Sequence, residues 1–251
     1  EARVRAFYQP IVRLDTREIV GAEALCRIIA KDGSVIPASM FQQATSDAHI
    51  ASEMTEVMLG QLARDLHEWR DRGISLPHVS FNVSSADFHL GRRHQQIARA
   101  FAGRDIPRDQ LIVEVTEGVY LGKRDNVIAR EIEKLRTSGL RVALDDFGTG
   151  FASLTHLLTV PVDIIKIDRS FIERLAPADP SSVILEGIFQ IAQKLGITAI
   201  AEGIETEEQA AHLAKFGCGL GQGFLVSSAV DFDTLTQMVL SGPGHRIAAA
   251  A

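Results

Sequence analysis

The sequence contains only two cysteines, Cys26 and Cys218, among its 251 residues. Two widely separated cysteines cannot form the disulfide framework of a small secreted protein or the thiolate cluster of a structural zinc site. The eight histidines are scattered and do not pair at the spacings that metal ligands use. The composition therefore argues against zinc sites and disulfide scaffolds, and it suits a reducing cytoplasm.

Long apolar runs and an excess of basic residues are also missing. No run reaches the ~20 residues of a membrane span, and the charged start Glu1–Arg5 does not resemble a secretory signal. The net charge of -6 provides no global basic field for a long nucleic acid. We therefore expect a cytoplasmic protein without membrane contact. The first residue is not Met, which indicates a fragment of a longer chain.

Alternating strand and helix patterns fill most of the sequence. Glycine follows each of the four clearest helices directly, as a left-handed C-cap requires. The expected strands are Ala6–Val12, Glu18–Ile28, His78–Val83, Leu111–Thr116, Leu140–Asp145, Asp163–Ile167, Thr198–Ala201 and Cys218–Phe224, and the expected helices are Ala51–Arg72, Asn126–Ser138, Ser181–Leu195 and Glu205–Phe216. Eight strands in one domain predict an α/β fold of the TIM type, a closed (β/α)₈ barrel spanning residues 1–251 with 242–251 as a loose tail.

One connection departs from the barrel pattern. Only Arg13–Arg17 separates the first two strands, and five residues cannot hold the crossover that parallel neighbours need. We therefore predict that the first strand is antiparallel to the others.

Acidic and amide residues mark the ends of most of these strands. They are Glu23, Asn82, Glu114, Asp145, Asp146 and Glu202, with Lys166 ending another strand. In a barrel, strand ends converge on one mouth, where catalytic residues lie. Taken singly, each acid reads as a solvated loop residue or helix cap, and a structural ion-pair network around Lys166 would need more cations than these strand ends supply. So many acids at one rim predict bound cations, and oxygen ligands favour Mg²⁺ or Mn²⁺.

The same positions fall in an ordered set of motifs. These are Tyr8-Gln9-Pro10-Ile11-Val12, Glu23-Ala24-Leu25-x-Arg27, Phe81-Asn82-Val83-Ser84, Glu114-Val115-Thr116-Glu117, Asp145-Asp146-Phe147-Gly148-Thr149-Gly150, Lys166-Ile167-Asp168, Ala201-Glu202-Gly203-Ile204-Glu205 and Gln222-Gly223-Phe224. The set resembles the EAL domains, phosphodiesterases that hydrolyse the bacterial second messenger cyclic di-GMP. The resemblance implies a hydrolase that produces linear pGpG.

The resemblance also implies roles in a two-metal site. Glu23, Asn82, Glu114 and Asp145 would hold one metal, while Asp145, Asp146 and Glu202 would hold or approach a second. Lys166 would orient the attacking water, although a structural pairing with Asp168 is the alternative. Glu117 resembles the acid that anchors the loop after Asp146, and Glu205 resembles a supporting acid. Mg²⁺ or Mn²⁺ would support turnover, whereas Ca²⁺ would bind and support little hydrolysis.

Substrate contacts follow from the resemblance as well. Arg27 resembles a phosphate-binding arginine, and a guanidinium fork suits two phosphate oxygens. Gln9, Leu25 and Gln222 resemble residues that line the guanine and ribose sites, with backbone capping at strand ends as the alternative for the two glutamines. Two departures from the family pattern, Ala229 and Phe151-Ala152, affect the expected shape of the base pocket and loop.

Partners and competing functions complete the expectations. The family resemblance, together with an apolar face, predicts a homodimer through the loop Gly148–Leu154 and the segment after it, and a GGDEF or sensor domain would lie outside the fragment. A receptor without turnover is one alternative, although every ligand position is intact. An aldolase with Lys166 as a Schiff base is another, but the neighbouring acids would keep that lysine protonated.

Overall fold

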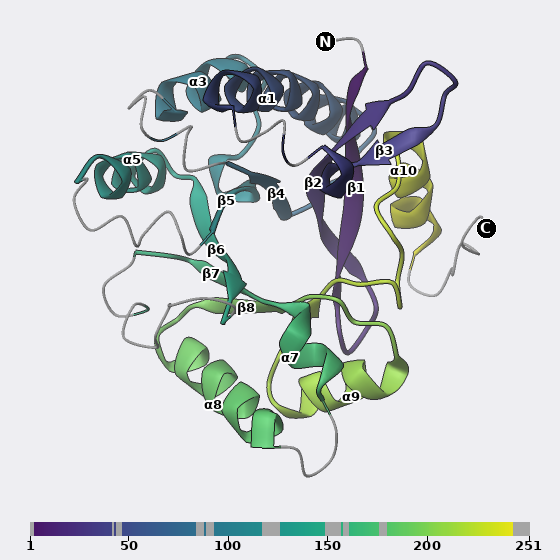
Figure 1. Ribbon diagram of the computed structural model, residues 1–251, viewed down its shortest axis with the longest axis vertical. Coiled ribbons are helices and arrows are strands. Elements are labelled where there is room, and N and C mark those ends of the chain that lie inside the picture. Colours follow the sequence, from purple (N-terminus) through teal and green to yellow (C-terminus); the bar gives the residue numbers. More distant parts are fainter. Residues whose placement is uncertain are drawn as a thin grey trace.

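The computed structural model describes residues 3–41, 43, 47–83, 88, 93–116, 126–148, 157, 161–175 and 180–242. Eight strands form a closed ring, because β1 pairs with β2 on one side and with β9 on the other. The strands are β1 (Val4–Arg13), β2 (Ile19–Ile29), β3 (Val35–Pro37), β4 (His78–Asn82), β5 (Leu111–Thr116), β6 (Arg141–Phe147), β7 (Ile164–Ile167), β8 (Thr198–Ala201) and β9 (Leu220–Gly221). The predicted TIM-type barrel is confirmed (Figure 1).

The first strand runs as the short connection predicted. β1 is antiparallel to both of its neighbours in the ring, and the other ring strands are parallel to one another. β3 is a further strand that pairs only with β2 and stands outside the ring. The sequence analysis missed β3, although Asp32-Gly33 before it is a strong hairpin signal and Gly33 has φ +87°.

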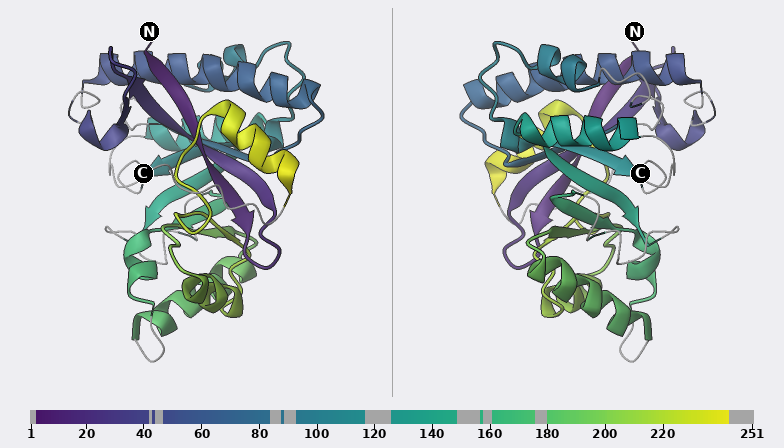
Figure 2. Two further views of the ribbon diagram at one scale, coloured as in Figure 1. Left: turned by 90° about the vertical axis from the view of Figure 1, so that its right-hand side faces the viewer. Right: turned by 90° about the vertical axis from the view of Figure 1, so that its left-hand side faces the viewer.

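Helices cover the outside of the ring. They are α1 (Ala48–Asp71), α3 (Arg93–Ala100), α5 (Asn126–Thr137), α7 (Arg169–Glu173), α8 (Pro180–Lys194), α9 (Glu207–Lys215) and α10 (Phe232–Ser241), with 3₁₀ turns η1 (Ala38–Met40) and η3 (Arg108–Gln110). The four expected helices are present with ends shifted by up to three residues, whereas α3, α7 and α10 were missed. The two side views in Figure 2 place α1 along one end of the molecule and α8 and α9 at the other.

Capping residues explain where several helices begin and end. Asp47, Thr206 and Asp231 accept hydrogen bonds from the first turns of α1, α9 and α10. The glycines predicted to end helices have positive φ, from +71° at Gly196 to +91° at Gly139. The start of α10 carried a readable signal, since Asp231 precedes an apolar pattern.

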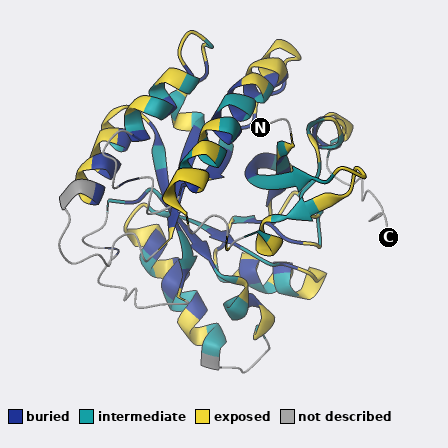
Figure 3. Ribbon diagram, turned by 45° about the horizontal axis from the view of Figure 1, so that its top comes forward, coloured by how far each residue is buried: buried dark blue, intermediate teal, exposed yellow. Residues whose placement is uncertain are grey.

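The outer core lies between the ring and its helices. Each helix turns its buried face to the strands and its exposed face to solvent (Figure 3). Trp69 of α1 is an example. Its ring packs edge-on against the Tyr8 ring of β1 with 4.9 Å between the ring centroids, and its indole N–H donates to Thr236 Oγ1 of α10 at 2.7 Å. In the described part of the chain, no helix is long and apolar enough to cross a membrane.

Candidate active site

A small apolar layer closes the interior of the barrel below the acidic residues. It consists of Ile11, Val20, Ile112, Ala143, Ile164 and Ile200. Successive side chains in a strand alternate between faces, so residues two positions apart point the same way. Four of these apolar residues lie two positions before a polar site residue: Glu114, Asp145, Lys166 and Glu202. The strands therefore carry a polar layer directly above a sealed apolar floor.

Lys166 occupies the centre of this polar layer. Its Nζ lies 3.1 Å from Glu23 Oε2, 2.9 Å from Glu114 Oε2, 3.1 Å from Asp145 Oδ1 and 2.8 Å from Glu202 Oε1. Only 2% of the lysine side chain is exposed. Five strands, β2, β5, β6, β7 and the end of β8, thus deliver charged groups to one point. The alternative pairing of Lys166 with Asp168 is not what forms, because the Asp168 carboxylate caps α7 by accepting from Ser170 N at 2.9 Å.

One carboxylate oxygen near Lys166, Asp145 Oδ1, is left without a hydrogen bond among the described residues. An ammonium group has three N–H donors, and Lys166 donates hydrogen bonds to Glu23, Glu114 and Glu202. Asp145 Oδ1 is buried and, among the described residues, has no hydrogen-bond partner despite its short distance to Nζ. The lysine therefore cannot satisfy the whole cluster.

The Asp145-Asp146 doublet reaches the site through an irregular strand. In a regular strand two consecutive side chains point to opposite faces. The pairing of β6 with β7 shifts register between Leu144 and Phe147, and Asp146 has φ +54°. A bulge of this kind re-aims a side chain at some cost in backbone strain. As a result, both aspartates and Glu202 present carboxylate oxygens within 4.8 Å of one another.

Two amide side chains also donate hydrogen bonds to Glu23. Asn82 Nδ2 donates to Glu23 Oε1 at 2.9 Å, and Gln222 Nε2 donates to Glu23 Oε2 at 2.7 Å. Gln222 Nε2 also donates to Glu202 Oε1 at 2.9 Å. With its nitrogen used in this way, Asn82 still has its carbonyl oxygen for a ligand, as the sequence analysis expected of it.

These surroundings shift the pKa values of the site acids in different directions. Burial alone would raise the pKa of Glu23, but Lys166 and the two amides outweigh it and lower that pKa. Burial and the nearby Glu23 charge raise the pKa of Glu114 well above its usual value. Burial, with Glu23 and Asp145 adding to it against Lys166, raises the pKa of Glu202 to about 8. Burial would lower the pKa of Lys166, yet the four carboxylates raise it, so the lysine is a cation at neutral pH.

The remaining formal charge identifies the kind of ligand that fits. Glu23, Glu114, Asp145 and Glu202 are four acids in contact with Lys166, so within this group of described residues full ionisation leaves three negative charges. Burial, followed by the Asp145 and Asp168 charges, also raises the pKa of Asp146. A divalent cation with oxygen preference would remove this excess, and the donor set of carboxylates and one amide carbonyl suits Mg²⁺ or Mn²⁺.

The residues expected to contact substrate lie beside the polar layer. Gln9 of β1 is the register partner of Glu23, so both side chains share the inner face, and Gln9 Nε2 donates to Ser227 O at 3.2 Å. Leu25 and Arg27 follow Glu23 at two-residue steps along β2 and share that face. Arg27 is partly buried, and its Nη1 donates to Cys26 O at 3.0 Å.

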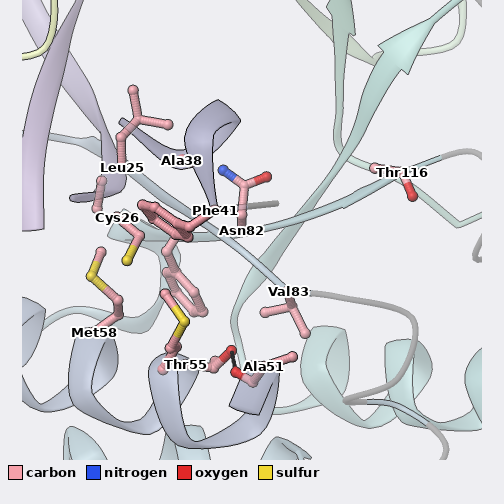
Figure 4. A pocket seen from close by; sticks show the side chains of 13 residues that line it. Leu25, Cys26, Ala38, Phe41, Ala51, Thr55, Met58, Asn82, Val83 and Thr116 are labelled. Atoms are coloured by element: carbon pink, nitrogen blue, oxygen red, sulfur yellow. Dashed lines mark hydrogen bonds between the residues drawn. The ribbon is translucent and has the colours of Figure 1, made fainter. Parts of the chain in front are cut away.

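A mostly apolar pocket of about 400 Å³ adjoins the site between α1, η1 and the ends of β2 and β4. In Figure 4, Thr55 and Ala51 of α1 lie at the bottom of the view, and Leu25 and Asn82 lie above them with Ala38 and Phe41 between. Its other lining residues are Ala24, Cys26, Ala38, Phe41, Met54, Met58, Phe81, Val83 and Thr116. Through Asn82 the pocket shares a residue with the acidic cluster. Its remaining surface provides apolar packing rather than charge.

Two expected supporting acids have different outcomes. Glu117 lies outside the described residues, so its predicted role stays a prediction. Glu205 is exposed and precedes α9, where its backbone N–H donates to Gln209 Oε1 at 2.8 Å. Among the described residues, no hydrogen bond or ion pair found for Glu205 involves its carboxylate. Gln222 shows the reverse: its contact with two carboxylates was missed, and no local sequence pattern signals it.

Comparison with known proteins places this geometry in a family. The model of the EAL domain family matches residues 1–229. The chain is 34% identical over 225 residues to the oxygen sensor protein DosP of Escherichia coli strain K12, a match that covers 90% of this chain and 28% of DosP. The chain therefore spans less than a third of that relative's length.

Solved structures give the same result. The PaMucR phosphodiesterase in complex with c-di-GMP superposes with a TM-score of 0.85 at 29% identity, covering 93% of this chain and 94% of that one. The EAL enzyme Bd1971 in its cAMP and cyclic-di-GMP bound form gives a TM-score of 0.87 at 28% identity, covering 94% of this chain and 65% of that one. Both likenesses extend over nearly the whole barrel.

Proposed function

Because this chain belongs to the EAL domain family, we propose that it is a metal-dependent phosphodiesterase that hydrolyses cyclic di-GMP to linear pGpG. The observation that carries the proposal is the buried Asp145 Oδ1, which lies in a ring of carboxylates and lacks a hydrogen bond within the described structure. A buried carboxylate oxygen without a donor is costly unless a cation shares its site. Asp145 is also the residue that would be shared by both metals.

The chain offers ligands for two divalent ions, Mg²⁺ or Mn²⁺. Glu23, Asn82, Glu114 and Asp145 would hold one, and Asp145, Asp146 and Glu202 the other. Such ions supply a nucleophilic water at neutral pH and neutralise charge on the transferring phosphate and the leaving oxygen. The oxygen-rich cluster and the excess negative charge support this assignment.

Lys166 has the properties of a positioning cation rather than a base or a nucleophile. Its contacts with four carboxylates keep it protonated, so it donates hydrogen bonds and cannot accept a proton at neutral pH. A protonated amine cannot attack a carbonyl group, which weighs against Schiff-base chemistry. In the proposed reaction Lys166 orients the attacking water and balances the charge of the acids around it, beside Glu202 and Asp146.

The rim of the barrel provides groups for the rest of the substrate. Arg27 would bind a phosphate oxygen, while Gln9 and Leu25 would contact the guanine and ribose groups. The family resemblance gives Gln222 the same role, but its hydrogen bonds to Glu23 and Glu202 favour a different one. The apolar pocket that includes Leu25 and Asn82 gives a planar base a surface to pack against next to the acidic cluster. A cyclic dinucleotide, with two phosphates and two bases, matches this combination better than a cyclic mononucleotide.

Turnover by the purified chain tests the proposal. Cyclic di-GMP should be converted to pGpG with Mg²⁺ or Mn²⁺, while cAMP and cGMP, run as matched substrates, should remain intact. Excess EDTA should stop the reaction, and Asp145→Ala should lower the rate by several orders of magnitude because a two-metal site fails as a unit. Full turnover in EDTA, or retained activity in Asp145→Ala, would overturn the two-metal mechanism. Tight binding without turnover would instead identify a receptor.

Assembly and regulation are part of the same proposal. The predicted homodimer interface, Gly148–Leu154 and the segment after it, lies mostly in residues 149–156 and 158–160, outside the described residues. A monomer by light scattering at high concentration would count against that dimer. The match to a sensor protein of which this chain spans only 28% supports a sensor or GGDEF domain elsewhere in the full-length protein.

A further inference from the structure

The ring of carboxylates is interrupted at β1, the antiparallel strand between β9 and β2, and we call this interruption the seam. Parallel strands bring their C-terminal ends to the mouth, but β1 runs the opposite way between β9 and β2. Glu23 stands on one side of this seam and Glu202, after β8, on the other. We propose that Gln222, which follows β9 at the seam, is a positioning residue that fixes the carboxylates of Glu23 and Glu202 in the orientation needed to hold metal. This inference rests on the proposed function.

The contacts of Gln222 support that role. One nitrogen, Nε2, donates to Glu23 Oε2 at 2.7 Å and to Glu202 Oε1 at 2.9 Å. The two oxygens also accept from Lys166, which has only donors, so they act as acceptors and the amide turns its NH₂ group toward them. Lys166 donates to the same two oxygens, so each of them is held from two directions.

The backbone gives Gln222 little freedom to serve elsewhere. Its N–H donates to Ala201 O at 2.9 Å, directly before Glu202, and its carbonyl accepts from Ile204 N at 3.1 Å. The next residue must be glycine, because a Cβ on Gly223 would lie 2.2 Å from the backbone of Ile204. Only 4% of Gln222 is exposed. Its backbone and side chain are therefore tied to the segment that carries Glu202.

A substrate contact alone would leave a different pattern. A side chain that waits for substrate needs its donors free, whereas both donor contacts of Gln222 are already made to Glu23 and Glu202. The orientation of metal-binding carboxylates by outer hydrogen bonds commonly changes metal affinity or activity about 10–100-fold. Gln222 is placed to orient Glu23 and Glu202 in this way, so its loss should change kcat and metal affinity rather than KM.

The first experiment uses Gln222→Met, which keeps the length of the side chain and removes the donors. Crystals grown without metal should show Glu202 and Glu23 turned from their present positions. The matched control is Gln237→Met, the same change at an exposed position of α10. Gln222→Asn, one methylene shorter and unable to span both carboxylates, carries the test if the methionine variant does not fold. Unmoved Glu23 and Glu202 side chains would overturn the proposal.

The second experiment measures metal affinity and kinetics separately. Calorimetric titration with Mn²⁺ should give a Kd about 10-fold higher for Gln222→Met than for the parent, with kcat lowered about 10–100-fold and KM within about twofold. A raised KM with unchanged Mn²⁺ affinity would overturn the proposal and leave Gln222 as a substrate contact. A parent chain that binds Mn²⁺ but does not hydrolyse cyclic di-GMP would refute the proposed function alone, because the crystal and calorimetric results would still test the positioning role.

Discussion

Replacing Lys166 by Met should destabilise the metal-free protein far more than the loss of an ordinary lysine. The Nζ atom lies 2.8–3.1 Å from four carboxylates and is almost fully buried. Removing one partner of a buried ion pair costs about 3–5 kcal/mol because the other charge is left uncompensated. A chain of this length changes Tm by about 2–4 °C per kcal/mol, so the loss corresponds to roughly 6–20 °C.

The assay is thermal unfolding in EDTA and again in millimolar Mg²⁺ or Mn²⁺. A divalent ion replaces the missing positive charge, so the difference in Tm between Lys166→Met and the parent should fall to less than half when metal is added. Turnover should stay low, because the ion does not replace the proposed orientation of water. The exposed Lys215, changed to Met, serves as control and should shift Tm by less than about 2 °C. A Lys166→Met protein that melts with the parent in EDTA would refute the reasoning.

Three further outcomes are expected. The metal-free protein should lose stability as pH rises from about 5 to 8, because burial raises the pKa of folded Glu202 to about 8 whereas the unfolded residue loses its proton above its ordinary pKa of 4.5. The effect is at most about 5 kcal/mol, and urea midpoints that rise over this range would contradict it. Ca²⁺ should support binding but poor hydrolysis, since its bonds of about 2.3–2.6 Å misplace the water that Mg²⁺ holds at about 2.0–2.1 Å; equal rates with the two ions would count against this. Glu117→Ala should lower turnover and leave metal affinity largely intact, in contrast to Glu114→Ala, and calorimetry that finds equal losses would show that the two acids share one role.

The fold was predictable because its signals are local. Alternating apolar patterns and glycine caps define the strands and helices, and the five residues Arg13–Arg17 alone determine that β1 is antiparallel. Of the missed elements, β3 and α7 are short, while β3 and α10 had local signals in Asp32-Gly33 and Asp231 that the search for long periodic patterns passed over. The predicted strand Cys218–Phe224 is Leu220–Gly221 in the structure, and after it the Gln222 carbonyl accepts from Ile204 N while Gly223 packs closely on the Ile204 backbone.

The site was predictable only in part, for a different reason. Convergence of Glu114, Lys166 and Glu202 follows from the barrel, since the ends of its parallel strands reach the same mouth, and Glu23 joins them from the middle of β2. The positive φ of Asp146 and the double contact of Gln222 depend on how neighbouring strands meet, which strand alternation does not reveal. Regular alternation would in fact have placed Asp146 opposite Asp145.

The antiparallel β1 also has a consequence for the order in which the chain assembles. β1 and β2 are joined by a five-residue turn and can form a hairpin early, since local contacts close at low entropic cost. Closure with β9 rests on two residue pairs, Val12 with Gly221 and Arg13 with Leu220, that join the two ends of the sequence. We expect the pairing of β1 with β9 to form late in folding, and its amide hydrogens to exchange early in native-state hydrogen-exchange experiments. Gln222 follows β9 directly and holds Glu23 and Glu202. An intermediate in which β1 and β9 are not yet paired would therefore have its parallel strands formed and its carboxylates still unordered. Cation binding would then report on the final folding step.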